Sequence, residues 1–362
     1  MMTYESDIFL NDSSSVFSLN NTYSNTSFGD LFSNVTRQWY VTVNVTNFTY
    51  SPLENATVSL NDSSNNLLWT ENTTSSGLTS SHIVSQYFLN SSGYLNYTPH
   101  DIIVSKNGFI EKIRSEAIDE SMSIFFRLGA NKTISSCQTM DEEGATYFLN
   151  VNITDSSPGD PCMVIEASNV TLDCMNNNIT GSSDWGMYVN NADNVTIQYC
   201  NIYNFTATGI LFENSSFGLI EYNDVSNSTF GHGIQMGTGS HNNSICFNNA
   251  SHNELTAYIA IENTSYYNVF HDNFSSYCND MGFEAEHGAH HNYFHNNTIL
   301  DTEIGVKLSP GSHNNTIRDN FINNTGGVNI DNSSDNLIEN NVISYSNSTG
   351  VTFQDNSSRN RI

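Results

Sequence analysis

The chain has 362 residues, of which 37 % are hydrophobic and 12 % aromatic, so it holds enough apolar material for an ordered core. Ten Lys and Arg face 37 Asp and Glu, and the formal net charge of −27 would repel nucleic acid and anionic lipid headgroups. These values exclude a disordered tail and argue against nucleic-acid binding. Such acidity is typical of a solubilising surface in a salty or cation-rich medium, with dedicated calcium sites as the alternative.

Glycosylation sequons of the form N-x-[ST] are unusually frequent. They occur roughly thirty times, from Asn11 to Asn356, whereas the frequencies of Asn, Ser and Thr alone would give roughly a dozen. Turn chemistry accounts for part of the excess, because all three residue types suit tight turns. We interpret the rest as N-glycosylation of an extracellular protein, with exposed candidates at Asn214, Asn332 and Asn356.

The six cysteines are compatible with an oxidising compartment, and they show no C-x-x-C spacing. The first residues lack the basic and apolar regions of a signal peptide. No apolar run approaches the ~18 residues of a transmembrane segment. Because the rest of the chain has the composition of a secreted protein, we expect that these termini are not those of the native precursor.

Residues 1–36 are polar, contain scattered aromatic residues and show no clear period, which is typical of a linker or of the end of a preceding segment. Residues 37–128 contain short alternating runs such as "QWYVTVNVT" and "SMSIFFRL", separated by turn residues. This pattern predicts a small antiparallel β-sandwich. The stretches "NATVSL…WTENTTSSG" and "YTPHDIIVSKNGF" resemble the carboxypeptidase-regulatory, transthyretin-like sandwich that precedes repeat regions in archaeal surface proteins.

From residue 170 onward two landmarks recur together at steps of 21 to 25 residues. The first is a small residue that opens an apolar strand: Gly186, Gly209, Gly233, Ala257, Gly282, Gly305, Gly327 and Gly350. The second is an apolar residue after an Asn-rich turn: Leu172, Ile197, Ile220, Ile245, Phe270, Phe294, Ile317, Ile338 and Ile362. Leucine-rich repeats share this period, but they need L-x-x-L-x-L and often a helical leg, and no helical period is present.

We therefore predict an all-β chain in which a right-handed parallel β-helix of about eight coils spans residues 170–362, with residues 129–169 as its opening or cap. In each G-φ-x-φ strand the two φ residues point inward. These predicted core residues are Ile210, Phe212, Ile234, Met236, Phe283, Ala285, Val306 and Leu308. An Asn before an apolar pair is expected to stack as a ladder inside the turns, at Asn178, Asn201, Asn249, Asn273, Asn297, Asn320 and Asn341. Ordinary solvated turn asparagines are the alternative.

The stretch "ISSCQTMDEEGATYFLNVNIT…CMVIEASNVTLDCMNNNITG" resembles the opening of archaeal NosD-like β-helix surface proteins, and the resemblance covers Cys137 to the end of the chain. It implies the shape of a right-handed β-helix. It implies no single activity, because the family includes carbohydrate-active enzymes, nitrous-oxide-pathway proteins and envelope components. Cys137 and Cys162 bracket the start of this region, where a covalent link would hold the first coil, so we predict that they form a disulfide.

The densest polar cluster is "GFEAEHGAHHNYFHNN". His291 and His313 fall on nearly the same turn of adjacent coils, and with Glu286 and His287 they form a candidate site for zinc or copper. The spacing matches no closed metal motif, and polar turn residues without an ion are the alternative.

Glu284 and Glu286 are predicted to point outward, two residues apart, with Glu284 beside Lys307 of the next coil. Paired carboxylates are what glycoside hydrolysis requires, so these three residues are catalytic candidates. The alternative is a surface ion pair. A lyase or epimerase acting on acidic sugars would depend on calcium or another divalent ion, because the region has few basic residues.

The remaining outward positions of these strands show no row of aromatic residues, and no P-loop, G-x-S-x-G, H-E-x-x-H or dinucleotide fingerprint occurs. We therefore expect a non-enzymatic, glycosylated cell-surface or extracellular scaffold: an envelope, sheath, filament or adhesin component. Its partners would be copies of itself, other surface proteins or glycans. A carbohydrate-active β-helix enzyme, and a module that binds carbohydrate or metal, are the alternatives.

Overall fold

The computed structural model describes residues 8–23, 26–155, 161–346 and 348–362. The chain forms two compact units, Met1–Ala130 and Asn131–Ile362. Every regular element in the described residues is a β-strand, as the all-β prediction requires.

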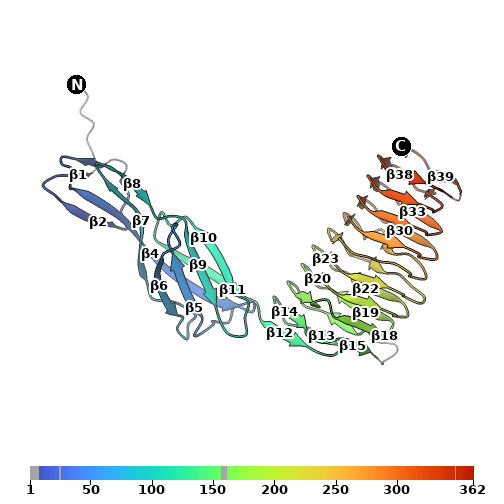
Figure 1. The fold of residues 1–362 in the computed structure, drawn as a ribbon, viewed down its shortest axis with the longest axis horizontal. Helices are drawn as coiled ribbons and strands as arrows, with labels where there is room; N and C mark the ends of the chain where they lie inside the picture. The colour runs from blue at the N-terminus through green and yellow to red at the C-terminus, as the bar shows by residue number, and fades with distance from the viewer. Residues whose placement is uncertain (1–7, 24–25, 156–160, 347) are drawn as a thin grey trace, which may run out of the picture. The chain divides into compact units, whose positions relative to one another are not determined.

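Unit 1 contains two main sheets and one small sheet (Figure 1). The four-stranded sheet has the order β10 (Lys112–Glu116), β9 (His100–Ser105), β5 (Thr57–Asn61), β6 (Leu67–Asn72). The five-stranded sheet has the order β11 (Met122–Leu128), β4 (Asn34–Asn47), β7 (His82–Asn90), β8 (Gly93–Asn96), with β2 (Ser15–Leu19) also paired to β4. The small sheet pairs β1 (Ile8–Leu10) with β3 (Thr26–Phe28).

The two main sheets of unit 1 share one buried core. Val41 and Val43 of β4 face this core together with Val58 of β5 and Ile102 of β9, and all four are fully buried. Trp39 begins the core on the long strand β4. The unit is therefore a β-sandwich, and inward residues alternate along strands such as β5, β9 and β11, as the sequence pattern indicates.

The described part of residues 1–36, predicted as a polar linker or the end of a preceding segment, contains the strands β1, β2 and β3 and the start of β4. β2 pairs in parallel with the first half of β4, and Ser15 lies opposite Asn34 in the register. β4 is long enough to pair with β2 along residues 34–38 and with β11 along residues 41–47. The short strands β1, β2 and β3 lack the apolar alternation of the later strands, so no pattern in the sequence predicts them.

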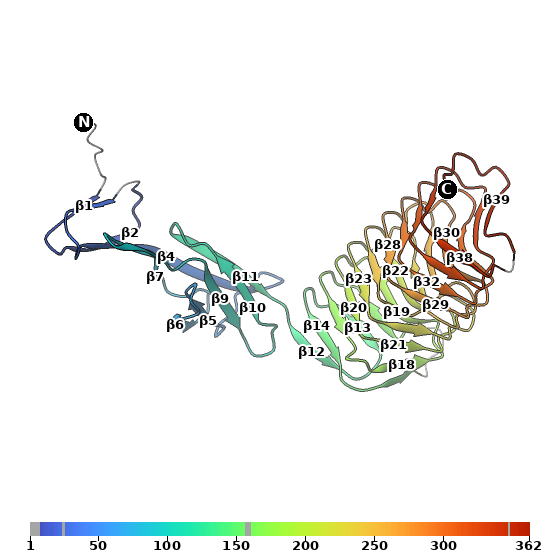
Figure 2. The ribbon, with the colours of Figure 1, turned by 45° about the horizontal axis from the view of Figure 1, so that its top comes forward.

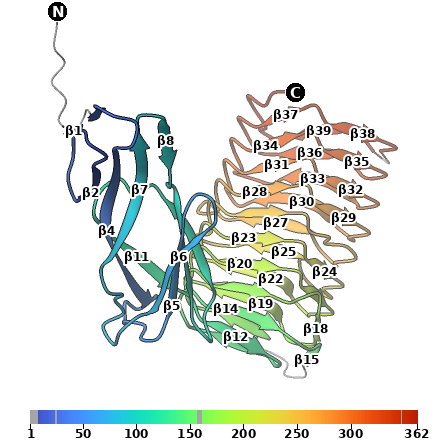
Figure 3. The ribbon, with the colours of Figure 1, turned by 60° about the vertical axis from the view of Figure 1, so that its left-hand side comes forward.

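Unit 2 is a parallel β-solenoid built from two continuous sheets and a shorter third one (Figures 2 and 3). Sheet 1 stacks ten strands: β12 (Asn131–Ile134), β14 (Thr146–Leu149), β17 (Thr171–Asp173), β20 (Thr196–Gln198), β23 (Leu219–Glu221), β26 (Ser244–Cys246), β28 (Val269–His271), β31 (Tyr293–His295), β34 (Thr316–Arg318) and β37 (Leu337–Glu339). Sheet 2 stacks another ten: β13 (Gln138–Met140), β16 (Met163–Ile165), β19 (Trp185–Asn190), β22 (Thr208–Glu213), β25 (Ile234–Met236), β27 (Tyr258–Ile261), β30 (Met281–Glu286), β33 (Ile304–Leu308), β36 (Val328–Asp331) and β39 (Val351–Gln354).

Sheet 3 forms the third side of each coil in two segments of four strands. The first segment is β15 (Ile153–Asp155), β18 (Asn178–Gly181), β21 (Asn201–Tyr203) and β24 (Asp224–Ser226). The second is β29 (Phe274–Ser276), β32 (Thr298–Leu300), β35 (Phe321–Asn323) and β38 (Val342–Ser344). Asn249 bridges the two segments, because it forms single β-bridges with Asp224 and with Phe274.

The two sequence landmarks mark sheets 1 and 2. The apolar landmark residues from Leu172 to Ile338 lie at the centres of the sheet 1 strands, aligned in register and buried. All eight predicted core residues of sheet 2 are fully buried. The solenoid is longer than the eight coils predicted, because residues 129–169 supply two further strands to each of these sheets.

The recurring glycine lies at the inner corner where sheet 3 gives way to sheet 2. A Cβ atom on Gly209 would lie 2.1 Å from Cγ1 of Val225, and one on Gly282 would lie 2.4 Å from Cγ2 of Ile299. Both Val225 and Ile299 are inward residues of sheet 3 in the following coil. The corner therefore has no room for a side chain when a branched residue faces it.

The predicted asparagine ladder exists, but its members differ in the first coils. The buried ladder consists of Asn223, Asn248, Asn273, Asn297, Asn320 and Asn341, and each donates its backbone and side-chain N–H groups to Oδ1 of the next. Among them, Asn273, Asn297 and Asn320 are at most 2 % exposed. The prediction is correct from Asn273 onward and wrong for Asn178, Asn201 and Asn249. Those three lie one position later, on the outer surface, where Asn201 donates to Asn178.

A second buried ladder runs along the other end of the sheet 1 strands. It consists of Asn243, Asn268, Asn292, Asn315, Asn336 and Asn360, and each backbone N–H again donates to Oδ1 of the next residue. The sequence pattern predicts these asparagines as turn residues, and their ladder was not predicted. Together the two ladders hold both ends of the sheet 1 strands in register.

Two disulfides link the first coils of the solenoid. One joins Cys137 to Cys162, the pair expected from the sequence, and the other joins Cys174 to Cys200. The backbone N–H of Cys200 donates to Oδ1 of Asn223, so Cys200 occupies the ladder position one coil before the first asparagine. Cys246 and Cys278 are free thiols in buried positions.

Candidate functional site

The outer face of sheet 2 carries a column of side chains in strand register. Leu211, Gln235, Ile259, Glu284 and Lys307 follow one another from coil to coil. The prediction that these residues point away from the core is correct, since their inward neighbours fill it. However, Ile259 is fully buried and Glu284 is only 4 % exposed, because side chains of successive coils cover one another.

Glu284 is the buried carboxylate of this face. Ser309 Oγ donates a hydrogen bond of 2.5 Å to Glu284 Oε1, and Thr256 Oγ1 lies 3.5 Å from Oε2. Burial raises the pKa of Glu284 to about 6, although the hydrogen bond from Ser309 acts in the opposite direction. Among the described residues no ion pair joins Lys307 to Glu284, although the positive charge of Lys307 acts to lower the pKa of Glu284.

Other acidic groups surround Lys307. Burial raises the pKa values of Asp280 and Glu286 above their usual range, while the positive charge of Lys307 lowers both. Glu286 Oε1 lies 3.4 Å from Nδ1 of His287. The sequence-predicted trio Glu284, Glu286 and Lys307 therefore shares one electrostatic environment, in which the carboxylates retain protons more readily than in water.

The raised pKa of Glu284 predicts a pH-dependent stability. Because the folded state binds this proton more tightly than the unfolded state does, stability should fall as the pH rises from about 4.5 through about 6. A difference of this size corresponds to about 2 kcal/mol once Glu284 is ionised. Glu284→Gln should remove that loss, so that its free energy of unfolding falls less over this interval than that of the unsubstituted protein. Chemical denaturation at pH 4.5 and pH 7 measures both proteins.

Glu303→Gln is the matched control for this prediction. Glu303 lies directly before β33 on the same side of the solenoid, but it is exposed. The control should retain the pH dependence of the unsubstituted protein. Equal slopes for the unsubstituted protein and Glu284→Gln would contradict the assignment of the raised pKa to Glu284.

Three histidines come together on another part of the surface. His290, His291 and His313 each offer one ring nitrogen within 4.8 Å of the others, and they form the one group of three or more metal-ligating side chains found in the described part of the chain. The predicted ligands His291 and His313 are brought together. Glu286 and His287 pair with each other instead, and His290 takes their place in the group. Three imidazole nitrogens are ligands that suit a transition-metal ion, whereas calcium prefers oxygen ligands.

Rows of aromatic rings follow the turns of the solenoid, which sequence reasoning missed. Tyr199, Tyr222 and Phe247 stack with centroids 5.3 and 5.1 Å apart, and all three have positive φ. Each precedes a ladder position, where left-handed backbone turns the chain and directs the side chain outward. The rings use their faces to stack on one another, so they serve as an external counterpart of the asparagine ladders. The regular spacing of Tyr199, Tyr222 and Phe247, at steps of 23 and 25 residues, was the signal that could have found them.

The predicted glycosylation sites differ in accessibility from other sequons. Asn214, Asn332 and Asn356 are exposed. In contrast, Asn273 begins the sequon "NFS" but is 2 % exposed and belongs to the buried ladder. Part of the sequon excess therefore arises from ladder and turn chemistry rather than from sites that a glycan could reach.

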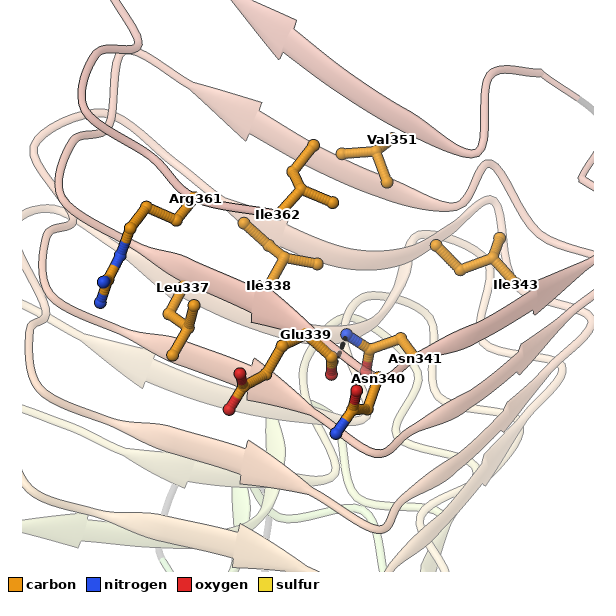
Figure 4. A pocket seen from close by; sticks show the side chains of 9 residues that line it. All are labelled: Leu337, Ile338, Glu339, Asn340, Asn341, Ile343, Val351, Arg361 and Ile362. Carbon is orange, nitrogen blue, oxygen red and sulfur yellow. Dashed lines mark hydrogen bonds between the residues drawn. The ribbon is translucent and has the colours of Figure 1, made fainter.

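Two hollows lie near the last coils described. One of about 580 Å³ lies between β37, β38 and β39, and it is lined by Ile338, Ile343, Val351 and their neighbours (Figure 4). The side chains of these three residues point into it, as the inward residues of the final coil. The other, of about 420 Å³, lies on the outer face of sheet 2 and includes Asn329 and Thr352, which continue the column of Glu284 and Lys307.

Known proteins match the solenoid in sequence pattern. The family described as "Right handed beta helix region" matches residues 139–299, and the family described as "Periplasmic copper-binding protein (NosD)" matches residues 248–362. No curated protein sequence matches the chain. The two family matches and the parallel strand order support a NosD-like, right-handed β-helix. No helix in the described residues is long and apolar enough to cross a membrane.

Several solved structures are similar to the chain. The Dettilon tailspike protein gp208 aligns with a TM-score of 0.47 and 12 % identity over 67 % of this chain and 62 % of the tailspike. The periplasmic alginate epimerase AlgG aligns with a TM-score of 0.45 and 13 % identity over 66 % of this chain and 62 % of the epimerase. Endopolygalacturonase I from Stereum purpureum aligns with a TM-score of 0.44 and 11 % identity over 65 % of this chain and 91 % of that enzyme. The chain thus spans less than two thirds of the tailspike and of the epimerase.

Proposed function

We propose that this NosD-like right-handed β-helix is a non-enzymatic structural module that acts outside the cytoplasm, at a cell surface or in a periplasm. The observation that carries the proposal is the uninterrupted stacking of sheets 1 and 2, each with ten strands. Buried asparagine ladders follow the two ends of the sheet 1 strands. Since parallel strands stack about 4.8 Å apart, ten of them span roughly 45 Å between the first and last. A unit built in this way supplies stiff length.

The location outside the cytoplasm is supported by two further features. Disulfides such as Cys137–Cys162 and Cys174–Cys200 persist in oxidising compartments. One of the two matching families is described as periplasmic. The formal charge of −27 would keep such a module soluble in a salty medium. We include glycans on Asn214, Asn332 and Asn356 in the proposal, and copies of the chain or other surface proteins as its partners.

A second candidate function rests on Glu284. A buried carboxyl group with a pKa near 6, on the outer face of a β-helix and beside Lys307 in the column, has the properties of a general acid. The hollow at Asn329 and Thr352 extends that face. A carbohydrate-active enzyme acting on acidic sugars would use these groups to protonate the substrate and to offset developing negative charge.

Electron microscopy of native material, together with an assay on acidic polysaccharides, separates the two candidates. Ordered polymers or envelope arrays containing the solenoid, without cleavage of any polysaccharide tested, are the expected result. Monodisperse particles that cleave a polyuronate, and that lose this activity in both Glu284→Gln and Lys307→Ala, would overturn the structural proposal in favour of the enzyme. Glu254→Gln, at an exposed position of the solenoid that lines neither hollow, serves as the control for surface charge.

A further inference from the structure

Two columns of turn residues run side by side along the outside of the solenoid. His241, Tyr266, His290, His313 and Ser334 form the first column, in which consecutive members pair through single β-bridges. The second column is formed by the residues that directly follow them, and these have positive φ: Asn242, Tyr267, His291, Asn314 and Asp335. The side chains of both columns therefore meet their counterparts one coil later.

Three imidazole rings meet at one point of these columns. The rings of His290 and His313 stack with centroids 4.9 Å apart and an interplanar angle of 10°. The ring of His291 stands nearly perpendicular to both, at 82° to His290 and 89° to His313. The backbone N–H of His291 donates to the carbonyl of His313, which ties the turn of one coil to the next.

We propose that His290, His291 and His313 bind one divalent transition-metal ion, such as Zn²⁺ or Cu²⁺, through one nitrogen of each ring. Imidazole nitrogen is a ligand that these ions favour. With metal–nitrogen bonds of about 2.0–2.1 Å, the nitrogens of a tetrahedral site lie roughly 3.3 Å apart. The three nitrogens already lie within 4.8 Å of one another, so small ring rotations bring them to that spacing. The inference does not depend on the proposed structural function.

The protonation state of the group suits a metal ion. The Nδ1 atoms of His290 and His291 are 2.8 Å apart, so one ring donates a proton to the lone pair of the other. A neutral ring with a free lone pair is the form that binds a metal ion, and the ion replaces the shared proton.

The same columns provide substitutions that the fold already accepts. Asn occupies the position of His291 in the coils of Asn242 and Asn314, with the same positive φ. Ser334 follows His313 in its column, and Ser216 precedes His241. His291→Asn and His313→Ser should therefore remove ligands without disturbing the backbone. His241→Ser is the matched control, because His241 stacks on Tyr266 and contacts no other histidine among the described residues.

Calorimetric titration of the full chain without a polyhistidine tag tests the site, with ZnCl₂ and CuCl₂ as separate probes. We expect one ion per chain for the unsubstituted protein and for His241→Ser. His291→Asn and His313→Ser should each weaken binding by about tenfold or more, equivalent to about 1.4 kcal/mol. X-ray absorption of the zinc-loaded protein should show three imidazole nitrogens in the unsubstituted protein and fewer in either variant.

Two results would overturn the inference. One is the absence of a saturable event at one ion per chain in the unsubstituted protein. The other is equal weakening by His241→Ser and His291→Asn, which would indicate dispersed binding to surface histidines. Circular dichroism that is unchanged in all variants confirms that a loss of binding is not a loss of folding.

Discussion

Replacing Asn297 by Ala should destabilise the solenoid by about 3 kcal/mol or more, because several buried polar groups lose their partners at once. Asn297 Oδ1 accepts hydrogen bonds from both the backbone N–H and the side-chain Nδ2 of Asn273, and Asn297 Nδ2 donates to the carbonyl of Phe270 and to Asn320. Water cannot replace them, since Asn297 is 1 % exposed. Chemical denaturation monitored by circular dichroism measures the change.

Asn263→Ala is the control for the ladder prediction. Asn263 belongs to the same solenoid but is exposed in a turn. Its replacement should change the free energy of unfolding by less than about 0.5 kcal/mol. If Asn297→Ala were as mild as this control, the ladder would be a consequence of the fold rather than one of the interactions that hold it together.

Gly282→Ala should destabilise the protein by about 3 kcal/mol, since the added methyl group overpacks the inner corner. The new Cβ would lie 2.4 Å from Cγ2 of Ile299 and 2.7 Å from the carbonyl oxygen of Gly305. One coil earlier the equivalent residue is Ala257, and the equivalent of Ile299 is the smaller Ser275. In that coil the larger corner residue, Ala257, is thus matched by a smaller residue opposite it, Ser275.

A double-mutant cycle tests this explanation. Ile299→Ala alone should cost about 2–5 kcal/mol through the cavity it leaves. Combined with Gly282→Ala, the cost should be smaller than the sum of the two single changes by about 1–3 kcal/mol. Additive costs would show that the methyl group does not compete with Ile299 for the same space.

The repeat was predictable from the sequence because its signal is physical and occurs many times. Each coil needs an inward residue in sheet 1, such as Ile197 or Phe270, and a small residue at the corner of sheet 2. A sandwich strand such as β9, with buried Ile102 and Val104, is recognisable from alternation alone. The pairing strands β1 to β3 have no such pattern and were missed.

The site was harder to predict, because several side chains depend on a shift of one residue. In "FNNAS" either Asn248 or Asn249 satisfies the pattern of an asparagine before a small or apolar residue, and only the position of the left-handed turn places Asn248 inside. Alternation also gave the direction of Glu284 but not its burial, which depends on the side chains of neighbouring coils.

The turn before each sheet 1 strand has a consequence for how the sequence is interpreted. From β17 onward this turn has a left-handed residue, then a buried residue, and then the outward first residue of the strand. Where the first of these is Asn and the last is Ser or Thr, the three spell a glycosylation signal, as they do at Asn169, Asn194, Asn242 and Asn314. The geometry of this turn therefore accounts for the sequons at these positions, whether or not they carry a sugar. The number of sequons in this chain is thus not a count of its glycans.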